Sequence, residues 1–192
     1  MLIAVSQRSL TDTHSLSYDA LELSWYDFLE ACSLAPLLIP NHITQADYLI
    51  NTIQVKGILL TGGNNQPLRD LLEKSLIEYG ILHHLPIMGV CHGMQIIQSY
   101  FHVSLRPVSN HIATEQSIFI HGREKIVNSY HTIGTEETVP ELEVWARAKD
   151  NVIKAIRHVS LPIIGIMWHP ERKNPFSEED IDLFKCFFRE DL

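Results

Sequence analysis

The sequence predicts an α/β protein whose central, mostly parallel sheet is flanked by helices on both faces. Over the first hundred residues, short continuous apolar runs alternate with amphipathic stretches, as in strands buried between helices. In the second half, strand-like runs follow one another with short connections, which favours antiparallel pairing there. No repeat, low-complexity tract or linker divides the chain, so we expect residues 1–192 to form a single domain.

The first half contains four apolar runs that do not alternate in polarity and therefore predict buried strands. They cover residues 2–6, 36–39, 57–61 and 86–90. Apolar residues at helical spacing predict the helices that connect them. These helices are expected over residues 17–32, 44–52, 68–79 and 92–101.

The second half is rich in β-branched and aromatic residues arranged in short runs, which predicts further strands. These strands are expected over residues 103–108, 117–121, 125–130, 144–148, 152–158 and 163–168. A last amphipathic helix is expected over residues 177–189, because its Ser-Glu-Glu first turn suits a helix N-terminus.

Charge and hydropathy exclude several classes of function. Acidic residues outnumber basic ones by 23 to 15, and the net charge of −8 makes nucleic acid an improbable partner. A phosphorylated small ligand stays compatible with this charge, because one arginine or helix N-terminus can hold it. No apolar run approaches the roughly 20 residues of a membrane span. We expect a cytoplasmic protein without a membrane partner, whose three cysteines are reduced.

Ligands of such sheets collect at the carboxyl ends of the parallel strands. Four predicted strand ends carry glycines or polar side chains, and they are Ser6-Gln7-Arg8, Thr61-Gly62-Gly63, Cys91 and His169-Pro170-Glu171. Because these ends meet at one edge of the sheet, we expect a functional site there.

Cys91 is the candidate nucleophile. The stretch GVCHGMQ places it in a G-x-C-x-G pattern between a predicted strand and a predicted helix, the cysteine counterpart of a serine nucleophile elbow. A helix N-terminus favours thiolate over thiol, and the N–H of His92 would face an oxyanion. The alternative is that Cys91 is a small buried residue, which is our interpretation of Cys32 and Cys186.

A thiolate nucleophile needs a base, and the base needs a group that orients its ring. His169 ends a strand-like run and Glu171 follows two residues later, so both side chains are expected on the same side of extended chain. A single histidine at a strand end is usually a structural residue. Together with the elbow, however, His169 and Glu171 predict a catalytic triad with Cys91.

These motifs resemble the class I glutamine amidotransferases. GVCHGMQ matches the G-x-C-x-G-x-Q of that family, and WHPE matches its histidine and glutamate in the same chain order. VNSYH, residues 127–131, is similar to the V-N-S-x-H of the γ-glutamyl hydrolase-like branch. The resemblance implies a flavodoxin-like sheet and cleavage of a γ-glutamyl amide through a thioester on Cys91, without metal or cofactor.

The resemblance also implies roles for further residues. The N–H groups of Gly63 and His92 would form the oxyanion hole, beside Gly62. Gln95 would face the substrate, and the segment Ser129, Tyr130 and His131 would hold the α-amino and α-carboxylate groups of the glutamyl moiety.

The sequence says less about which γ-glutamyl amide is the substrate. The compact length, Arg8 after the first strand, Asn110-His111 and the WHPER ending are similar to hydrolases of γ-glutamyl-CDP-amidate, a phosphoramidate intermediate of surface-polysaccharide biosynthesis. Arg8, Arg172, Asn110 and His111 would then meet the diphosphate or the cytidine, since arginine binds phosphate bidentately. The alternative for each is a solvated surface residue.

The sequence is compatible with three hypotheses of function. The first is a free-standing hydrolase of a small γ-glutamyl substrate, either the CDP-amidate or an amine such as γ-glutamyl-aminobutyrate. The second is a glutaminase subunit that supplies ammonia to a separate synthetase. The third is a non-enzymatic protein that kept the fold, which the intact Cys91, His169 and Glu171 disfavour. A homodimer is the assembly we consider, because it is common among compact sheets.

Overall fold

The computed structural model describes residues 1–189 of the 192-residue chain, so residues 190–192 of the expected domain lie outside it. Within these residues the main sheet has the strand order β4-β1-β5-β6-β13-β12-β11-β8-β9. Its parallel part consists of β4 (Ala35–Ile39), β1 (Leu2–Ser6), β5 (Ile58–Leu60), β6 (Ile87–Val90) and β13 (Ile163–Ile166). Its antiparallel part consists of β12 (Ile153–His158), β11 (Leu142–Ala148), β8 (Ile112–Ile120) and β9 (Arg123–Tyr130). The predicted α/β class is confirmed.

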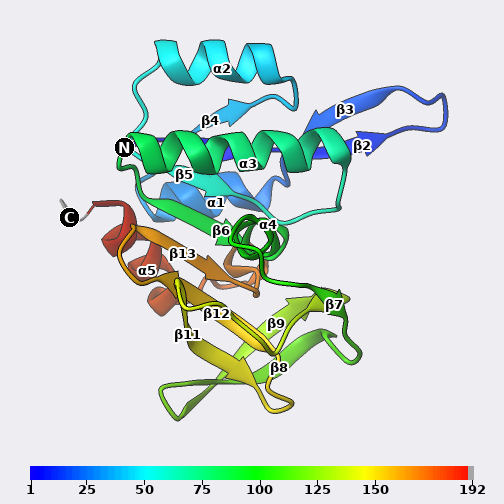
Figure 1. Cartoon of the computed structure of the whole chain (residues 1–192), viewed down its shortest axis with the longest axis vertical. Coiled ribbons are helices and arrows are strands. Elements are labelled where there is room, and N and C mark those ends of the chain that lie inside the picture. The colour runs from blue at the N-terminus through cyan, green and yellow to red at the C-terminus, as the bar shows by residue number, and fades with distance from the viewer. Residues whose placement is uncertain (190–192) are drawn as a thin grey trace.

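Helices cover both faces of the parallel part (Figure 1). α3 (Pro67–Leu82) and α4 (His92–Tyr100) lie on one face, and α1 (Ser24–Ala31) and α5 (Glu178–Arg189) lie on the other. α2 (Ile43–Thr52) follows the edge strand β4. The ring of Phe184 in α5 packs edge-on against Phe28 of α1, with 4.9 Å between ring centroids. This contact packs α5, the last helix of the chain, against α1, the first helix.

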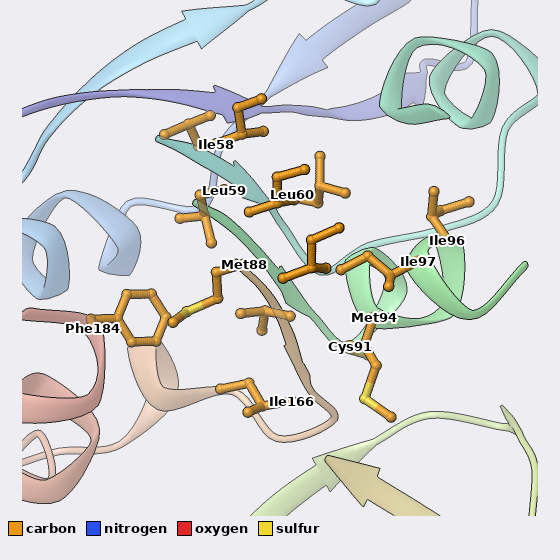
Figure 2. Packing of buried hydrophobic residues seen from close by; sticks show 14 of the residues in the cluster. Ile58, Leu59, Leu60, Met88, Cys91, Met94, Ile96, Ile97, Ile166 and Phe184 are labelled. Carbon is orange, nitrogen blue, oxygen red and sulfur yellow. The ribbon is translucent and has the colours of Figure 1, made fainter. Parts of the chain in front are cut away.

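The apolar core lies between the sheet and these helices (Figure 2). Every residue of β5 and β6 is buried, as the continuous apolar runs predicted. Full burial of a large aliphatic side chain contributes about 1.5–3 kcal/mol to stability. The core extends up to Cys91, which follows β6 and lies next to Met94 of α4 (Figure 2).

The position of β13 decides where the second half of the chain meets the first. This strand comes from the C-terminal half, yet it pairs in parallel with β6, and Ile166 lies opposite Val90. The backbone N–H of Cys91 donates to the carbonyl of Ile166 at 2.8 Å. The chain that leaves β13 therefore runs directly beside Cys91.

The helix expected over residues 17–32 is wrong in its first part. A hairpin of β2 (Arg8–Thr11) and β3 (Ser17–Ala20) precedes α1 and projects from the body of the molecule (Figure 1). In its turn, one carboxylate oxygen of Asp12 accepts the N–H groups of His14 and Leu16 at 2.8 and 2.9 Å. Local turn chemistry and strand pairing thus override the helical spacing of residues 17–23.

The strand expected over residues 103–108 is also wrong in most of its length. Only β7 (Arg106–Pro107) forms there, because its partner β10 (Ile133–Gly134) has two residues and Pro107 has no N–H to donate. The other predicted elements are present with shifts of a few residues at their ends. Across residues 1–189, no helix combines the length and the apolar character needed to cross a membrane.

Candidate active site

Cys91 lies at a sharp turn between β6 and α4. Its backbone has φ 52° and ψ −102°, a conformation that side-chain-bearing residues seldom adopt. The flanking glycines make the turn sterically feasible. A Cβ on Gly93 would lie 2.1 Å from the carbonyl oxygen of Leu60, and one on Gly89 would lie 2.6 Å from the carbonyl carbon of Gly93. The glycines of the G-x-C-x-G pattern therefore let α4 pack directly on the strands.

His169 and Glu171 follow β13. The imidazole Nδ1 of His169 lies 2.6 Å from Oε1 of Glu171, and both side chains are buried. Glu171 lies in a short 3₁₀ helix, η1 (Pro170–Arg172), rather than in extended chain. The expectation of two side chains on one side of a strand is therefore wrong in its geometry, because the turn at Pro170 brings the carboxylate back to the ring.

Gly62 lies against the His169 ring. A Cβ at Gly62 would approach Cε1 of that ring to 2.5 Å, so only glycine leaves room for the imidazole in this position. The end of β5, which carries Gly62, and the end of β13, which carries His169, thus meet at the same edge of the sheet. This is the edge at which the sequence predicted a site.

The thiol and the imidazole form a coupled pair. Burial disfavours ionisation of Cys91, but a hydrogen bond and the charge of His169, with a further contribution from His92, outweigh burial and lower the pKa of the thiol below its ordinary value of 9.0. Burial likewise opposes protonation of His169, but Cys91 and Glu171 raise its pKa to about 9. Both shifts favour a thiolate beside an imidazolium, which is the reactive form of a nucleophilic cysteine.

Asn128 is a residue of this site that the sequence analysis did not single out. Its side-chain amide donates to the backbone carbonyl of His169 at 2.8 Å, and its Oδ1 accepts the backbone N–H of His169 at 2.8 Å. Through these two bonds, the Asn128 side chain in β9 holds the backbone of His169 in place. Its place within VNSYH was the available signal, since the segment was already part of the family pattern.

In residues 129–131, which follow Asn128, the side chains alternate between buried and exposed positions. Tyr130 is exposed, and its ring centroid lies 5.7 Å from that of His169. Ser129 and His131 are buried. The hydroxyl of Ser129 donates to the carbonyl of His111 at 2.8 Å, and Nδ1 of His131 faces the carbonyl of Ile133 at 2.9 Å.

Lys154 of β12 is a second residue that the sequence analysis missed. Its Nζ donates to Oγ of Ser129 at 3.0 Å and faces Nε2 of His131 at 2.6 Å, while its side chain is almost fully buried. Burial lowers the pKa of Lys154 to about 7, against the attraction of Asp150 and Cys91. Burial and the Lys154 charge lower the pKa of His131 to about 3, so this ring is neutral.

The residues expected at the oxyanion hole and facing the substrate lie around the elbow. Gly63 follows β5 with φ 148°, and a Cβ there would lie 2.2 Å from Nη1 of Arg69. His92 begins α4, where its backbone N–H belongs to the unpaired first turn. Gln95, one turn further, donates from its amide to the carbonyl of Ile133 at 3.0 Å. This bond connects α4 to the strand that follows His131.

The residues expected to meet a nucleotide separate into two groups. Arg8 and Arg172 line one small cavity together with Gly62 and Glu171. The Arg172 guanidinium is already paired with Glu22, with contacts of 2.7 to 3.1 Å. A second, larger cleft of about 520 Å³ is lined by Asn128, Tyr130, Arg172, Lys173, Asn174 and four residues of β8 and β9, and His169 is not among its lining residues.

Asn110 and His111 lie elsewhere, at the start of β8. Asn110 is exposed and has φ 64°. His111 is buried, where its ring stacks on that of His131 and its Nε2 lies 2.9 Å from a carboxylate oxygen of Asp150. The structure thus places His111 behind the Ser129–His131 segment and not beside the two arginines.

Comparison with known proteins is consistent with this site. The family model described as glutamine amidotransferase class-I matches residues 18–190. The γ-glutamyl-CDP-amidate hydrolase of Campylobacter jejuni is 31% identical over an alignment of 202 positions, which covers 98% of each chain. One subunit of the glutamine-hydrolysing GMP synthase of Pyrococcus abyssi is 31% identical over 153 positions, covering 75% of this chain and 80% of its own.

A solved structure shares the fold. The crystal structure of a protein described as a putative GMP synthase subunit from Thermoplasma acidophilum superposes with a TM-score of 0.77 at 19% identity, covering 98% of this chain and 92% of its own. The fold, the elbow at Cys91 and the match over most of the chain lead to one conclusion: the chain belongs to the class I glutamine amidotransferase family.

Proposed function

We propose that this protein is a cysteine-dependent hydrolase that cleaves a γ-glutamyl amide bond through a γ-glutamyl thioester. The observation that carries the proposal is the environment of Cys91. Its thiol has a lowered pKa at a strained elbow, next to a histidine whose Nδ1 lies 2.6 Å from the carboxylate of Glu171. This set contains a nucleophile, an acid–base group and a residue that orients it.

In the proposed reaction, the Cys91 thiolate attacks the δ-carbonyl carbon of the glutamyl group. The C–N bond breaks as the imidazolium of His169 gives its proton to the leaving nitrogen, and a thioester remains. Neutral His169 then takes a proton from water, whose oxygen attacks the thioester carbon, and the C–S bond breaks to release glutamate. The N–H groups of Gly63 and His92 stabilise the oxyanions, and loss of one such donor costs roughly 3 kcal/mol of transition-state stabilisation.

The favoured substrate is γ-glutamyl-CDP-amidate, an intermediate of surface-polysaccharide phosphoramidate biosynthesis. Similarity over 98% of both chains to a hydrolase of that name supports this choice. The cleft lined by Tyr130, Arg172 and Lys173 supports it as well, because it offers an aromatic ring and the Lys173 cation to a nucleotide diphosphate, while Arg172 stays paired with Glu22. We propose that Gln95 and the Ser129–His131 segment hold the glutamyl part, and that Arg8, beside Arg172, also faces the leaving group.

Two other amides compete with this substrate. One is a γ-glutamyl amine such as γ-glutamyl-aminobutyrate. The other is glutamine itself, cleaved by a glutaminase subunit that passes ammonia to a synthetase. The similarity to one subunit of a GMP synthase favours this last alternative over an inert protein.

The test is glutamate release from γ-glutamyl-CDP-amidate, γ-glutamyl-aminobutyrate and glutamine by the isolated protein. We expect the CDP-amidate to be cleaved fastest without any partner, and we expect Cys91→Ala and His169→Ala to abolish release. Cys186→Ala is the matched control, because Cys186 is an exposed cysteine on α5. Full activity of Cys91→Ala would refute the proposal, and cleavage of glutamine only with an added synthetase would favour the glutaminase alternative.

A further inference from the structure

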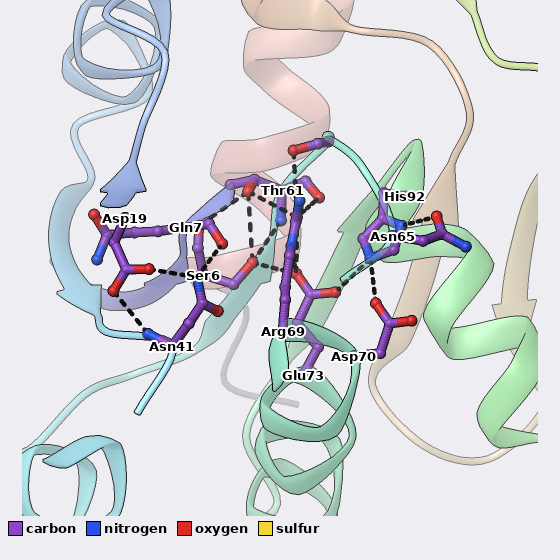
Figure 3. A network of polar contacts seen from close by, with 11 residues as sticks. Ser6, Gln7, Asp19, Asn41, Thr61, Asn65, Arg69, Asp70, Glu73 and His92 are labelled. Atoms are coloured by element: carbon purple, nitrogen blue, oxygen red, sulfur yellow. Dashed lines mark hydrogen bonds and ion pairs between the residues drawn. The ribbon is translucent and has the colours of Figure 1, made fainter. Parts of the chain in front are cut away.

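The side chain of His92, directly after Cys91, lies in a buried polar network between α4 and α3 (Figure 3). Only 1% of the side chain is exposed. Nδ1 lies 3.0 Å from Oδ1 of Asn65, and Nε2 lies 3.2 Å from Oδ1 of Asp70 and 3.1 Å from Oε2 of Glu73. Nε2 makes ion-pair contacts with both carboxylates but has hydrogen-bond geometry to neither, so the two negative charges at short range are what favour the imidazolium.

Glu73 joins this ring to the rest of the network. Its side chain is fully buried in α3, between two cationic groups. Oε1 accepts from Nε and Nη2 of Arg69 at 3.1 and 2.9 Å and from Oγ of Ser6 at 2.6 Å, while Oε2 faces His92. A buried carboxylate is stable only when it is paired. Two cations, Arg69 and His92, therefore balance two carboxylates, Asp70 and Glu73.

The network is held against the strand ends that form the candidate active site. Nη2 of Arg69 donates to the carbonyl of Thr61 at 2.7 Å, and Oγ of Ser6 accepts the N–H of Thr61 at 3.0 Å. These contacts fix α3 at the ends of β1 and β5 (Figure 3). Burial opposes protonation of His92, and Arg69 repels its charge, but Asp70 and Glu73 outweigh both and raise its pKa above the ordinary 6.5.

The charge of His92 acts on the neighbouring thiol. Among the groups that face Cys91, His169 and His92 favour the thiolate, and Glu171 opposes it, while burial opposes it most. Lys154 of β12 and Arg172 of η1 add attractive charges. His92 differs from His169 in one respect. In the proposed reaction His169 gives up its proton to the leaving nitrogen, whereas nothing in that cycle removes the proton of His92.

We propose that His92 is a positioning residue, held as an imidazolium by Asp70 and Glu73 of α3, whose persistent charge stabilises the thiolate of Cys91. The proposal rests on the proposed function, in which that thiolate is the nucleophile. His92 then has two separate contributions to the site: its backbone N–H to the oxyanion, and its side-chain charge to the nucleophile before and after each turnover.

The test compares His92→Gln with His92→Arg in a Cys186→Ser background, which removes the exposed thiol. The rate of Cys91 alkylation by iodoacetamide is followed by peptide mass between about pH 4 and pH 10. We expect His92→Gln to raise the midpoint of the alkylation profile by about one pH unit, because a neutral amide removes a neighbouring charge. His92→Arg, which keeps the charge, should stay near the parent, as should the exposed control His14→Gln.

Equal midpoints in the parent, Gln and Arg proteins would overturn the proposal, and so would equal shifts in Gln and Arg, since either result assigns the network a structural role alone. If His92→Gln does not fold, ¹⁵N NMR of the wild-type ring replaces it. An imidazolium that persists well above pH 6.5 supports the proposal, and deprotonation near pH 6.5 contradicts it. Alkylation displaces iodide and cleaves no amide bond, so it is independent of glutamate release. The proposal can therefore fail while glutamate is still released from the substrate panel, and the reverse also holds.

Discussion

Cys91 adopts a backbone conformation that costs of order 1–3 kcal/mol for a residue with a side chain. The pairing of β6 on one side and the hydrogen bonds of α4 on the other keep it there. The N–H of Cys91 donates to Ile166 in β13, and its carbonyl accepts the N–H of Gln95 in α4. The flanking strand and helix therefore keep Cys91 in its strained backbone conformation, in which its thiol interacts with His169.

The first prediction concerns the space beside the imidazole. Gly62→Ala would place a methyl group 2.5 Å from Cε1 of His169, so the ring must leave the position in which it interacts with Cys91. We expect glutamate release to fall at least about tenfold, equivalent to about 1.4 kcal/mol, while circular dichroism stays unchanged. Gly134→Ala is the control, because its Cβ would lie 3.2 Å from a methyl group of Val152 and at ordinary contact distance, 3.6 Å, from Cε1 of His131 and a methyl group of Val108. Equal activity of the two variants would contradict this account.

The second prediction separates the two bonds that Asn128 makes to His169. Asn128→Asp keeps an acceptor for the N–H of His169 but loses the donor to its carbonyl, whereas Asn128→Ala loses both. At about 0.5–1.5 kcal/mol for each bond, kcat should fall further in the Ala variant than in the Asp variant. Steady-state kinetics with the best substrate of the panel measure the difference. A kcat equal to wild type in Asn128→Ala would show that the backbone needs no such clamp.

At the scale of elements, the contact between α4 and β5 depends on one missing side chain. Gly93→Ala would bring a Cβ to 2.1 Å from the carbonyl oxygen of Leu60, and backbone cannot rotate away as a side chain can. We expect a loss of about 1–3 kcal/mol in the free energy of unfolding, measured by urea denaturation. Ser99→Ala on the same helix should change it little, since Ser99 is only half-buried. Equal stabilities would mean that α4 can shift outward at no cost.

The sequence pattern of apolar residues predicted the type of an element, helix or strand, wherever burial of one face or of the whole element was enough to determine it. The parallel strands β1, β4, β5 and β6 follow from apolar runs, and α3 and α4 follow from helical spacing. The hairpin of β2 and β3 was not predictable in this way, because residues 17–20 form a strand only by pairing with residues 8–11. The Asp12 turn that connects them uses one carboxylate oxygen for two N–H groups, which apolar periodicity does not record.

At the scale of the whole molecule, Lys154 connects the candidate site to stability. The pKa of its buried amine is about 7 in the folded chain and ordinary, 10.5, when unfolded. Between these values the unfolded state binds more protons, so this residue destabilises the fold most below about pH 7, and the cost declines as pH rises toward 10.5. Lys154→Met should therefore be the more stable protein at pH 7, with an advantage that shrinks by about 1.4 kcal/mol per pH unit above it.

Urea denaturation of both proteins at pH 7 and pH 9 measures this difference. Glutamate release should fall in Lys154→Met, because Nζ donates to Ser129 and faces His131 in the proposed glutamyl-binding segment. Lys149→Met is the control, since Lys149 is largely exposed. A stability difference that does not vary with pH would show that the amine is charged in the folded protein throughout this range.

The sequence by itself determined the fold class, the elbow around Cys91 and the family, because periodicity, glycine spacing and short motifs are local properties of the chain. The position of His169 and Glu171 at a strand end also predicted them as partners of Cys91, and the family resemblance agreed with this prediction. Only the tertiary structure decided how these residues meet: β13, from the far half of the chain, pairs beside β6 and ends next to the thiol. It alone showed Lys154, Asn128 and the pairing of His92 with Asp70 and Glu73, since a polar residue on a helix or strand acquires its charge state only from the neighbours that folding brings to it.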